Sequence, residues 1–238
     1  MISIRTIERA VVGEPGKVFS TAPEVAIGDD GKTYYIKGQN SRVTFSEVVG
    51  CRLAALAGLD VPNAHVGSFD GSLYAAIESV PSPYRDIRPW LRDQRRIANP
   101  EKLFEVIAVD TWLVNDDRNM GNVVGSAIGN GRINLFMIDF EKSRALGESP
   151  FIGSGVVEPR CLWPTAELGS ILRQIRPPQC PRVVVEKIRA ISVQQLRDSI
   201  LPVAAELPFV SWHESTIEVL ARRAQDIDSL VENVWATN

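Results

Sequence analysis

The sequence predicts an α+β fold in which a small β-rich first part, residues 1–80, precedes a mainly helical second part, residues 81–238. In the first part, β-branched and aromatic residues flank Gly/Asp turns, which is typical of β-hairpins. Beyond residue 99, apolar residues recur at helical spacing. The 238 residues are 45% hydrophobic and 23% charged, an ordinary globular composition that suits one large domain or two closely joined parts.

Two hairpins are predicted in the first part. The apolar runs 25–27 and 33–37 flank a Gly-Asp-Asp-Gly turn, and the runs 66–69 and 73–77 flank Asp70-Gly71. Each pair of runs has the length and the turn chemistry of two antiparallel strands. Two nearby prolines, Pro81 and Pro83, end this part and begin a connector.

A helix is predicted between the two hairpins, over residues 44–58. Thr44 is a candidate N-cap, and Glu47 follows three residues later at the spacing of a capping box. Gly58 is placed to end the helix.

The second part is predicted to begin with a helix whose N-cap is Asn99 and whose first helical residue is Pro100. We expect Trp112 of this helix to be a core residue, because it lies on the apolar stripe. A polar loop over residues 115–121 follows, and then two short strands at 123–124 and 133–138. The rest of the chain is predicted to be mainly helical, with a last helix that begins near Ser211 and continues to Val234.

Composition excludes several classes of function. The net charge of −3 and the pI near 5.6 lack the basic excess of a nucleic-acid-binding protein. Three separated cysteines and two histidines indicate neither a disulfide framework nor a zinc site, and they leave little scope for a histidine-dependent hydrolase. No apolar run has the length of a membrane span, and the N-terminus lacks a signal-peptide core. We therefore expect a cytoplasmic protein.

The residues that indicate chemistry lie in the polar loop and at the end of the strand that follows it. Phosphoryl transfer needs one carboxylate facing the acceptor hydroxyl, and a carboxylate and a carboxamide that hold magnesium against the phosphates. Asp117 and Asn122 in the loop and Asp139 at the strand end supply this set. Asp, Asn and Gly are also common turn residues. That alternative does not explain Asp139, because a carboxylate ending a buried strand needs a partner or a metal.

These segments resemble those of HipA-like kinases. Residues 115–122 resemble the family's N-x-D-R-x-x-x-N catalytic loop, and residues 137–141 resemble the metal-binding strand end. Type II phosphatidylinositol 4-kinases carry a loop related to the first of these. Three weaker similarities precede them in the expected order: a phosphate-covering loop at 19–24, an ATP-lysine strand at 34–38 and the following helix at 45–62. Together they span roughly residues 15–145. The resemblance implies a bilobal protein-kinase-like fold with a β-rich N-lobe and a helical C-lobe.

The resemblance also implies a set of nucleotide-binding residues. Lys37 would bind the α- and β-phosphates of ATP as a point charge, and Glu47 would pair with Lys37 unless its role is the capping box. The segment 77–80 would be the hinge, in which Glu78 and Val80 offer backbone groups to adenine. Ser20 and Thr21 would lie over the phosphates. Relatives autophosphorylate in that loop, so these two residues are either modification sites or ordinary turn residues.

In the transfer step, the resemblance implies that Asp117 accepts the proton of the substrate hydroxyl and that Asn122 and Asp139 hold Mg²⁺. Arg118 would orient the loop, touch a phosphate or pair with a nearby carboxylate. The sequence departs from the family at Asn119, where histidine is common, and it lacks the G-x-G-x-x-G loop of eukaryotic-type protein kinases.

Three functions remain open at this point. The first is a kinase that uses Mg-ATP to phosphorylate Ser or Thr of a protein partner. The second is a lipid or small-molecule kinase with the same site. The sequence shows no basic amphipathic surface helix of the kind that binds membranes, which argues against a lipid substrate. The third is a pseudokinase or binding scaffold, against which stands the complete set Lys37, Asp117, Asn122 and Asp139. Any regulatory protein partner is not readable from the sequence.

Overall fold

The first part of the chain forms a closed five-stranded barrel in a computed structural model that describes residues 1–8, 24–38, 40–149 and 182–236. Its strands, in the order β1-β2-β3-β5-β4, are β1 (Ile2–Glu8), β2 (Glu24–Gly28), β3 (Thr33–Lys37), β4 (Ala64–Phe69) and β5 (Ser72–Glu78). Both predicted hairpins are present as β2–β3 and β4–β5. The barrel closes because β1 pairs in parallel with β4, with Ile2 opposite Gly67, a long-range pairing that no local pattern indicated.

The two faces of β3 have different environments. Tyr34 and Ile36 point into the barrel, where they pack with a small apolar cluster that includes Ile4 and Tyr74. Since side chains alternate along a strand, Tyr35 and Lys37 lie on the other face, and Tyr35 packs against the main core of the molecule. The face of β3 that carries Lys37 therefore looks away from the barrel interior.

Helix α1 (Ser41–Leu56) begins earlier than predicted, and its N-cap is Asn40 rather than Thr44. The Asn40 side chain accepts a hydrogen bond from the backbone N–H of Arg42 at 2.8 Å. Thr44 and Glu47 are buried inside the helix, so the predicted capping box is wrong. The helix packs between β5 and α6, and the role of Glu47 must come from tertiary contacts.

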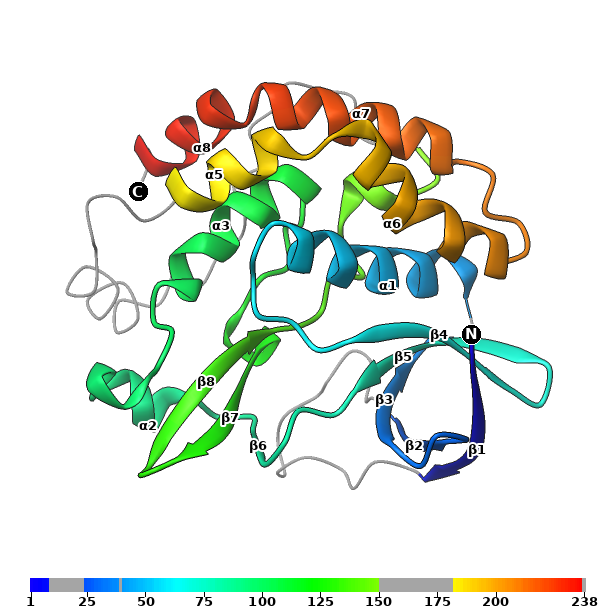
Figure 1. Cartoon of the computed structure of the whole chain (residues 1–238), viewed down its shortest axis with the longest axis horizontal. Helices are drawn as coiled ribbons and strands as arrows, with labels where there is room; N and C mark the ends of the chain where they lie inside the picture. The colour runs from blue at the N-terminus through cyan, green and yellow to red at the C-terminus, as the bar shows by residue number, and fades with distance from the viewer. Residues whose placement is uncertain (9–23, 39, 150–181, 237–238) are drawn as a thin grey trace.

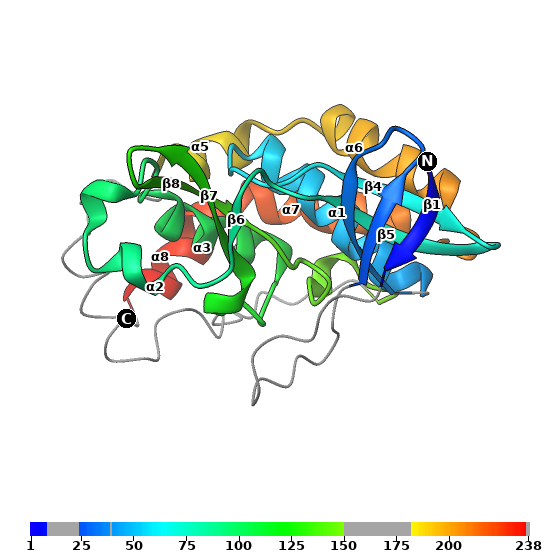
Figure 2. The same ribbon diagram turned by 90° about the horizontal axis from the view of Figure 1, so that it is seen from below.

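The second part combines a small sheet with helices. Figures 1 and 2 show the barrel and the sheet β6-β7-β8 at opposite ends, with helices α5 to α8 together on one side. The elements are β6 (Pro83–Tyr84), α2 (Arg88–Leu91), η1 (Gln94–Arg96), α3 (Lys102–Leu113), η2 (Met120–Asn122), β7 (Val123–Gly129), β8 (Arg132–Met137), η3 (Arg144–Leu146), α5 (Arg182–Ala190), α6 (Val193–Glu206), α7 (His213–Gln225) and α8 (Ile227–Ala236). The predicted hairpin is present, with a first strand longer than expected.

Asn99 is not the N-cap of α3, which begins at Lys102 after Glu101. Its carboxamide instead accepts a hydrogen bond from the N–H of Leu135 at 2.8 Å and donates to the carbonyl of Leu135 at 2.9 Å. It also donates to the carboxylate of Asp60 at 2.7 Å. A polar contact with β8 has therefore replaced the capping role that the local sequence indicated.

Helix α3 lies at the centre of the helical part, in contact with α5, α7 and α8. Trp112 is fully buried, as predicted, and its indole N–H donates to the carbonyl of Leu220 at 3.0 Å. The predicted last helix is in fact two helices, because α7 ends at Gln225 and α8 begins at Ile227. Within the described ranges, no helix is both long and apolar enough to cross a membrane.

His65 on β4 should make the stability of the protein depend on pH. Burial, assisted by the charge of Arg52, lowers the pKa of His65 below its ordinary value of 6.5. The unfolded chain therefore binds more protons than the folded protein as the pH falls through 6.5, and the free energy of unfolding decreases. Urea unfolding at pH 7.5 and about pH 5.5 should show a smaller decrease for His65→Gln than for the unmodified protein. An equal decrease in both would contradict the assignment.

Candidate active site

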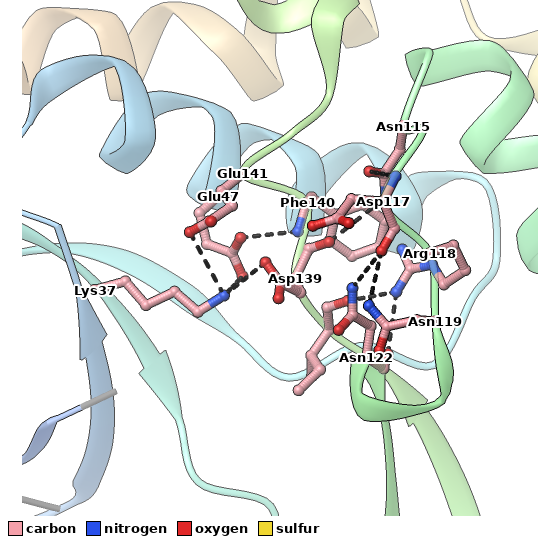
Figure 3. A network of polar contacts seen from close by, with 11 residues as sticks. Lys37, Glu47, Asn115, Asp117, Arg118, Asn119, Asn122, Asp139, Phe140 and Glu141 are labelled. Atoms are coloured by element: carbon pink, nitrogen blue, oxygen red, sulfur yellow. Dashed lines mark hydrogen bonds and ion pairs between the residues drawn. The ribbon is translucent and has the colours of Figure 1, made fainter. Parts of the chain in front are cut away.

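Three carboxylates surround the ammonium group of Lys37 at the end of β3 (Figure 3). Lys37 Nζ lies 2.8 Å from Asp139 Oδ1, 3.7 Å from Glu47 Oε1 and 3.9 Å from Glu141 Oε2. Glu47 comes from α1, whereas Asp139 and Glu141 follow β8. The consecutive elements β3 and α1 thus meet a segment about 100 residues later at one cation, in an arrangement that includes the pair Lys37–Glu47.

The environment of Lys37 keeps it charged. Burial alone would lower the pKa of Lys37, but the attraction of the Glu47 and Asp139 carboxylates outweighs burial and raises it. For Glu47, burial raises the pKa, and the charge of Lys37 offsets this only in part. Burial also raises the pKa of Glu141. Lys37 is thus the main nearby positive charge for Glu47 and Glu141.

Glu47 also positions the chain after Asp139. Its Oε2 accepts a hydrogen bond from the backbone N–H of Phe140 at 2.8 Å. Its Oε1 is buried, has no hydrogen-bond partner among the described residues and is turned toward Lys37. Gly50, one turn later on α1, allows the close approach, because a Cβ at this position would lie 2.4 Å from the Cβ of Phe140. The helix therefore fixes both the lysine and the backbone that presents Asp139.

Asp139 has a left-handed backbone with φ of 69°, which is uncommon for a residue other than glycine. Such a conformation costs on the order of 1–3 kcal/mol and persists where surrounding contacts hold it. Here the N–H of Ile138 donates to the carbonyl of Asn122 at 3.1 Å, and the N–H of Phe140 donates to Glu47. The turn after β8 is thus held on both sides of Asp139, and it directs the carboxylate toward Lys37.

The loop after α3 carries Asp117, which is exposed, and Asn122, which is buried. The side-chain amide of Asn122 donates to the backbone carbonyl of Asp117 at 3.0 Å, and so does that of Asn119. Asn119 also accepts from the N–H of Gly121 at 2.8 Å. The NH₂ group of Asn122 already donates to Asp117, so its Oδ1 is the side-chain atom that could bind a cation.

Arg118 is fully buried and braces this loop from behind. Its guanidinium donates to both carboxylate oxygens of Asp110, at 2.9 and 3.0 Å. Its Nη1 also donates to the backbone carbonyls of Asn122, at 3.0 Å, and of Ile138. Of the roles that the sequence left open for Arg118, the structure shows pairing with a carboxylate and orientation of the loop.

Asp110 and Asn115 are two residues of the candidate site to which the sequence analysis gave no role, although Asn115 is the first residue of the loop motif. The buried side chain of Asn115 donates to Asp110 Oδ1 at 3.0 Å and to the carbonyl of Asp139 at 3.5 Å. The backbone N–H of Asp117 donates to Asn115 Oδ1 at 3.5 Å. The available signal was Asp110 itself, a carboxylate within the apolar sequence of α3, because a buried charge needs a partner.

The remaining predicted residues lie elsewhere. Ser20 and Thr21 are outside the described residues. The backbone N–H of Glu78 donates to the carbonyl of Asn63 at 2.8 Å, and its carboxylate pairs with Lys32 at 3.0 Å, so both groups are engaged within the barrel. Val80, in the connector after β5, is buried.

The donor set fits a magnesium ion held jointly with phosphates. Mg²⁺ prefers hard oxygen ligands and usually takes only one or two carboxylates from the protein. Asp139 and the Oδ1 of Asn122 are such ligands, and Arg118 links the backbone at Asn122 to the residue before Asp139. Among the described residues, no three His, Cys, Asp or Glu side chains form a ready metal cluster, so the protein groups alone do not make a closed metal cage.

The fold of this chain is similar to the folds of two solved structures. The crystal structure of a Helicobacter pylori proinflammatory kinase, CtkA, matches with a TM-score of 0.53 and 13% identity, over 90% of this chain and 94% of that chain. A chain of the Shewanella oneidensis MR-1 toxin–antitoxin complex of HipA, HipB and operator DNA matches with a TM-score of 0.51 and 11% identity. That match covers 83% of this chain and 59% of the other. No protein-family model and no curated protein matches the sequence. The likeness shows a mixed α+β kinase-like fold.

Proposed function

We propose that this protein is an ATP-dependent kinase of the HipA-like type. Two contacts carry the proposal. Lys37 contacts Asp139 at 2.8 Å, and in the loop after α3 the side chain of Asn122 contacts the backbone of Asp117. A kinase-like fold is a weak guide to function by itself. The four side chains are those that phosphoryl transfer needs, and the contacts that position them come from separate parts of the fold.

The two parts of the chain divide the work in this proposal. Residues 1–80 form the N-lobe and bind the nucleotide through Lys37, which Glu47 orients. Residues 81–238 form the C-lobe and provide Asn122 and Asp139 to hold magnesium. Held at these two residues, Mg²⁺ would neutralise part of the negative charge of the phosphates. Lys37 binds the α- and β-phosphates, and the segment 77–80 lies near the base.

Asp117 is the proposed general base. Its carboxylate accepts the proton of the acceptor hydroxyl as the hydroxyl oxygen forms a bond to the γ-phosphorus and the bond to the β,γ-bridging oxygen breaks. The leaving group is ADP. The exposure of Asp117 favours an acceptor that approaches from solvent, and we propose a serine or threonine hydroxyl of a protein. Arg118 acts behind the loop and does not contact the phosphates.

Nucleotide binding tests this proposal. Mg-ATP should raise the melting temperature, because a ligand that binds only the folded state stabilises it by about 2.7 kcal/mol at 100 times its dissociation constant. Asp139→Asn should weaken the magnesium-dependent part of the shift. Asp228→Asn is the matched control, since Asp228 pairs with Arg189 on the exposed surface of α8. The absence of any shift at millimolar Mg-ATP would contradict the proposal.

A further inference from the structure

Tyr35 shares the outward face of β3 with Lys37. The residues opposite them on β5 are Ile77 and Ala75, respectively, and both belong to the main core. Two residues along a strand are separated by about 7 Å. An aromatic ring and the proposed phosphate-binding ammonium group therefore lie side by side on one apolar surface.

The guanidinium of Arg85 lies over the ring of Tyr35, with its central carbon 5.3 Å from the ring centroid. Arg85 belongs to the connector, directly after β6, and is exposed. A cation over an aromatic ring at an exposed site contributes about 0.5–1 kcal/mol. The contact spans from the connector to β3, and it is weak enough for a better stacking partner to replace it.

We propose that the face of Tyr35 covered by Arg85 is the stacking platform for the purine base of the bound nucleotide. The inference rests on the proposed kinase function, because Lys37 fixes the phosphates beside this platform. A planar base offers a larger aromatic surface than a guanidinium and stacks through its π-face whatever its edge groups are. The spacing from Tyr35 to Lys37 leaves room for the sugar between base and phosphates.

The base and Arg85 cannot occupy the same ring face together. Arg85 therefore covers Tyr35 in the nucleotide-free protein and leaves it when the base binds. Because of this competition, removing the ring of Tyr35 and removing the guanidinium of Arg85 should have opposite effects on nucleotide affinity. Loss of the ring removes the platform, whereas loss of the guanidinium removes the competitor.

Titration calorimetry with Mg-ATP and with magnesium tripolyphosphate, which has no base, tests the inference. Tyr35→Leu, which keeps an apolar side chain in the core, should raise the dissociation constant of Mg-ATP by about tenfold or more. Arg85→Ala should lower it by about two- to fivefold. Neither variant should change the affinity for tripolyphosphate, and this ligand also reports that the site is folded.

Two further variants serve as controls. Tyr35→Phe keeps the ring and should bind Mg-ATP like the unmodified protein. Arg95→Ala removes an arginine of η1 whose side chain is 94% exposed, and it should leave both affinities unchanged.

The possible outcomes separate the inference from the function on which it rests. If Tyr35→Leu weakens ATP and tripolyphosphate equally, or leaves ATP binding unchanged, Tyr35 is not a base platform. If Arg85→Ala weakens ATP binding, Arg85 does not compete with the base. If the unmodified protein binds neither ligand, the kinase proposal itself is overturned and the inference falls with it.

Discussion

Asp117→Ala should lower phosphoryl transfer by roughly 10²- to 10⁴-fold, the usual contribution of a general base, while Mg-ATP binding stays almost unchanged. Asp117 is exposed and makes its contacts to Asn119 and Asn122 through its backbone carbonyl. Removal of the carboxylate therefore leaves these contacts in place. The measurement is transfer of labelled γ-phosphate from ATP to the protein or to added protein substrates, beside calorimetry of Mg-ATP.

Asp116→Ala is the matched control for this change, because it removes the same group one residue earlier in the same loop. It should retain most of the transfer activity. If Asp117→Ala keeps near-normal transfer, or if Asp116→Ala loses as much as Asp117→Ala, the general base has been assigned to the wrong residue. A parallel loss of nucleotide affinity in Asp117→Ala would place its carboxylate on the metal side of the reaction.

Asp110→Ala should lower the free energy of unfolding by about 3–5 kcal/mol, because it leaves the buried guanidinium of Arg118 without its counter-ion. Both side chains of the pair are fully buried, and the contact is bidentate. Equilibrium unfolding in urea gives the change from the shift in midpoint at constant slope. Glu214→Ala is the control, since it breaks the exposed pair Arg197–Glu214 and should cost less than about 1 kcal/mol.

The double variant Asp110→Leu/Arg118→Met separates stability from positioning. With both charges replaced by apolar side chains of similar size, the part of the loss that comes from the unpaired buried guanidinium should return. Phosphoryl transfer should not return, because the carbonyls of Asn122 and Ile138 would no longer be held by Arg118. A double variant that recovers both stability and transfer would show that the pair has no part in positioning the site.

Local signals in the sequence were sufficient for the hairpins and for the loop with Asp117 and Asn122. Turn chemistry and strand alternation act between neighbouring residues, so β2–β3 and β4–β5 could be predicted. The barrel closure could not, because the pairing of Ile2 with Gly67 joins strands with no shared turn. Neither could the brace of Asp110 and Arg118, since nothing in the sequence states which buried groups meet.

The two wrong caps have different physical causes. Thr44 and Asn99 are both residue types that commonly cap helices, but each has another role in the folded chain. Asn40 begins α1 earlier, and this places Glu47 inside the helix, where it reaches Phe140. The carboxamide of Asn99 is engaged with Leu135. For Asn99, a long-range contact outweighed a local capping preference that contributes about 1 kcal/mol. For α1, another local cap, Asn40, took the place of Thr44.

The contact of Asn99 with β8 has a consequence for behaviour at high protein concentration. An unpaired strand at the edge of a sheet is a template for pairing with a second molecule and so for aggregation. On the outer side of β8, the carboxamide of Asn99 pairs with the N–H and carbonyl of Leu135, as a neighbouring strand would. Ile97 forms a bridge to Ile133, whose carbonyl accepts from the N–H of Ala98. Residues 97–99 thus cover the edge of β8, which would otherwise be free to pair with a strand of another molecule.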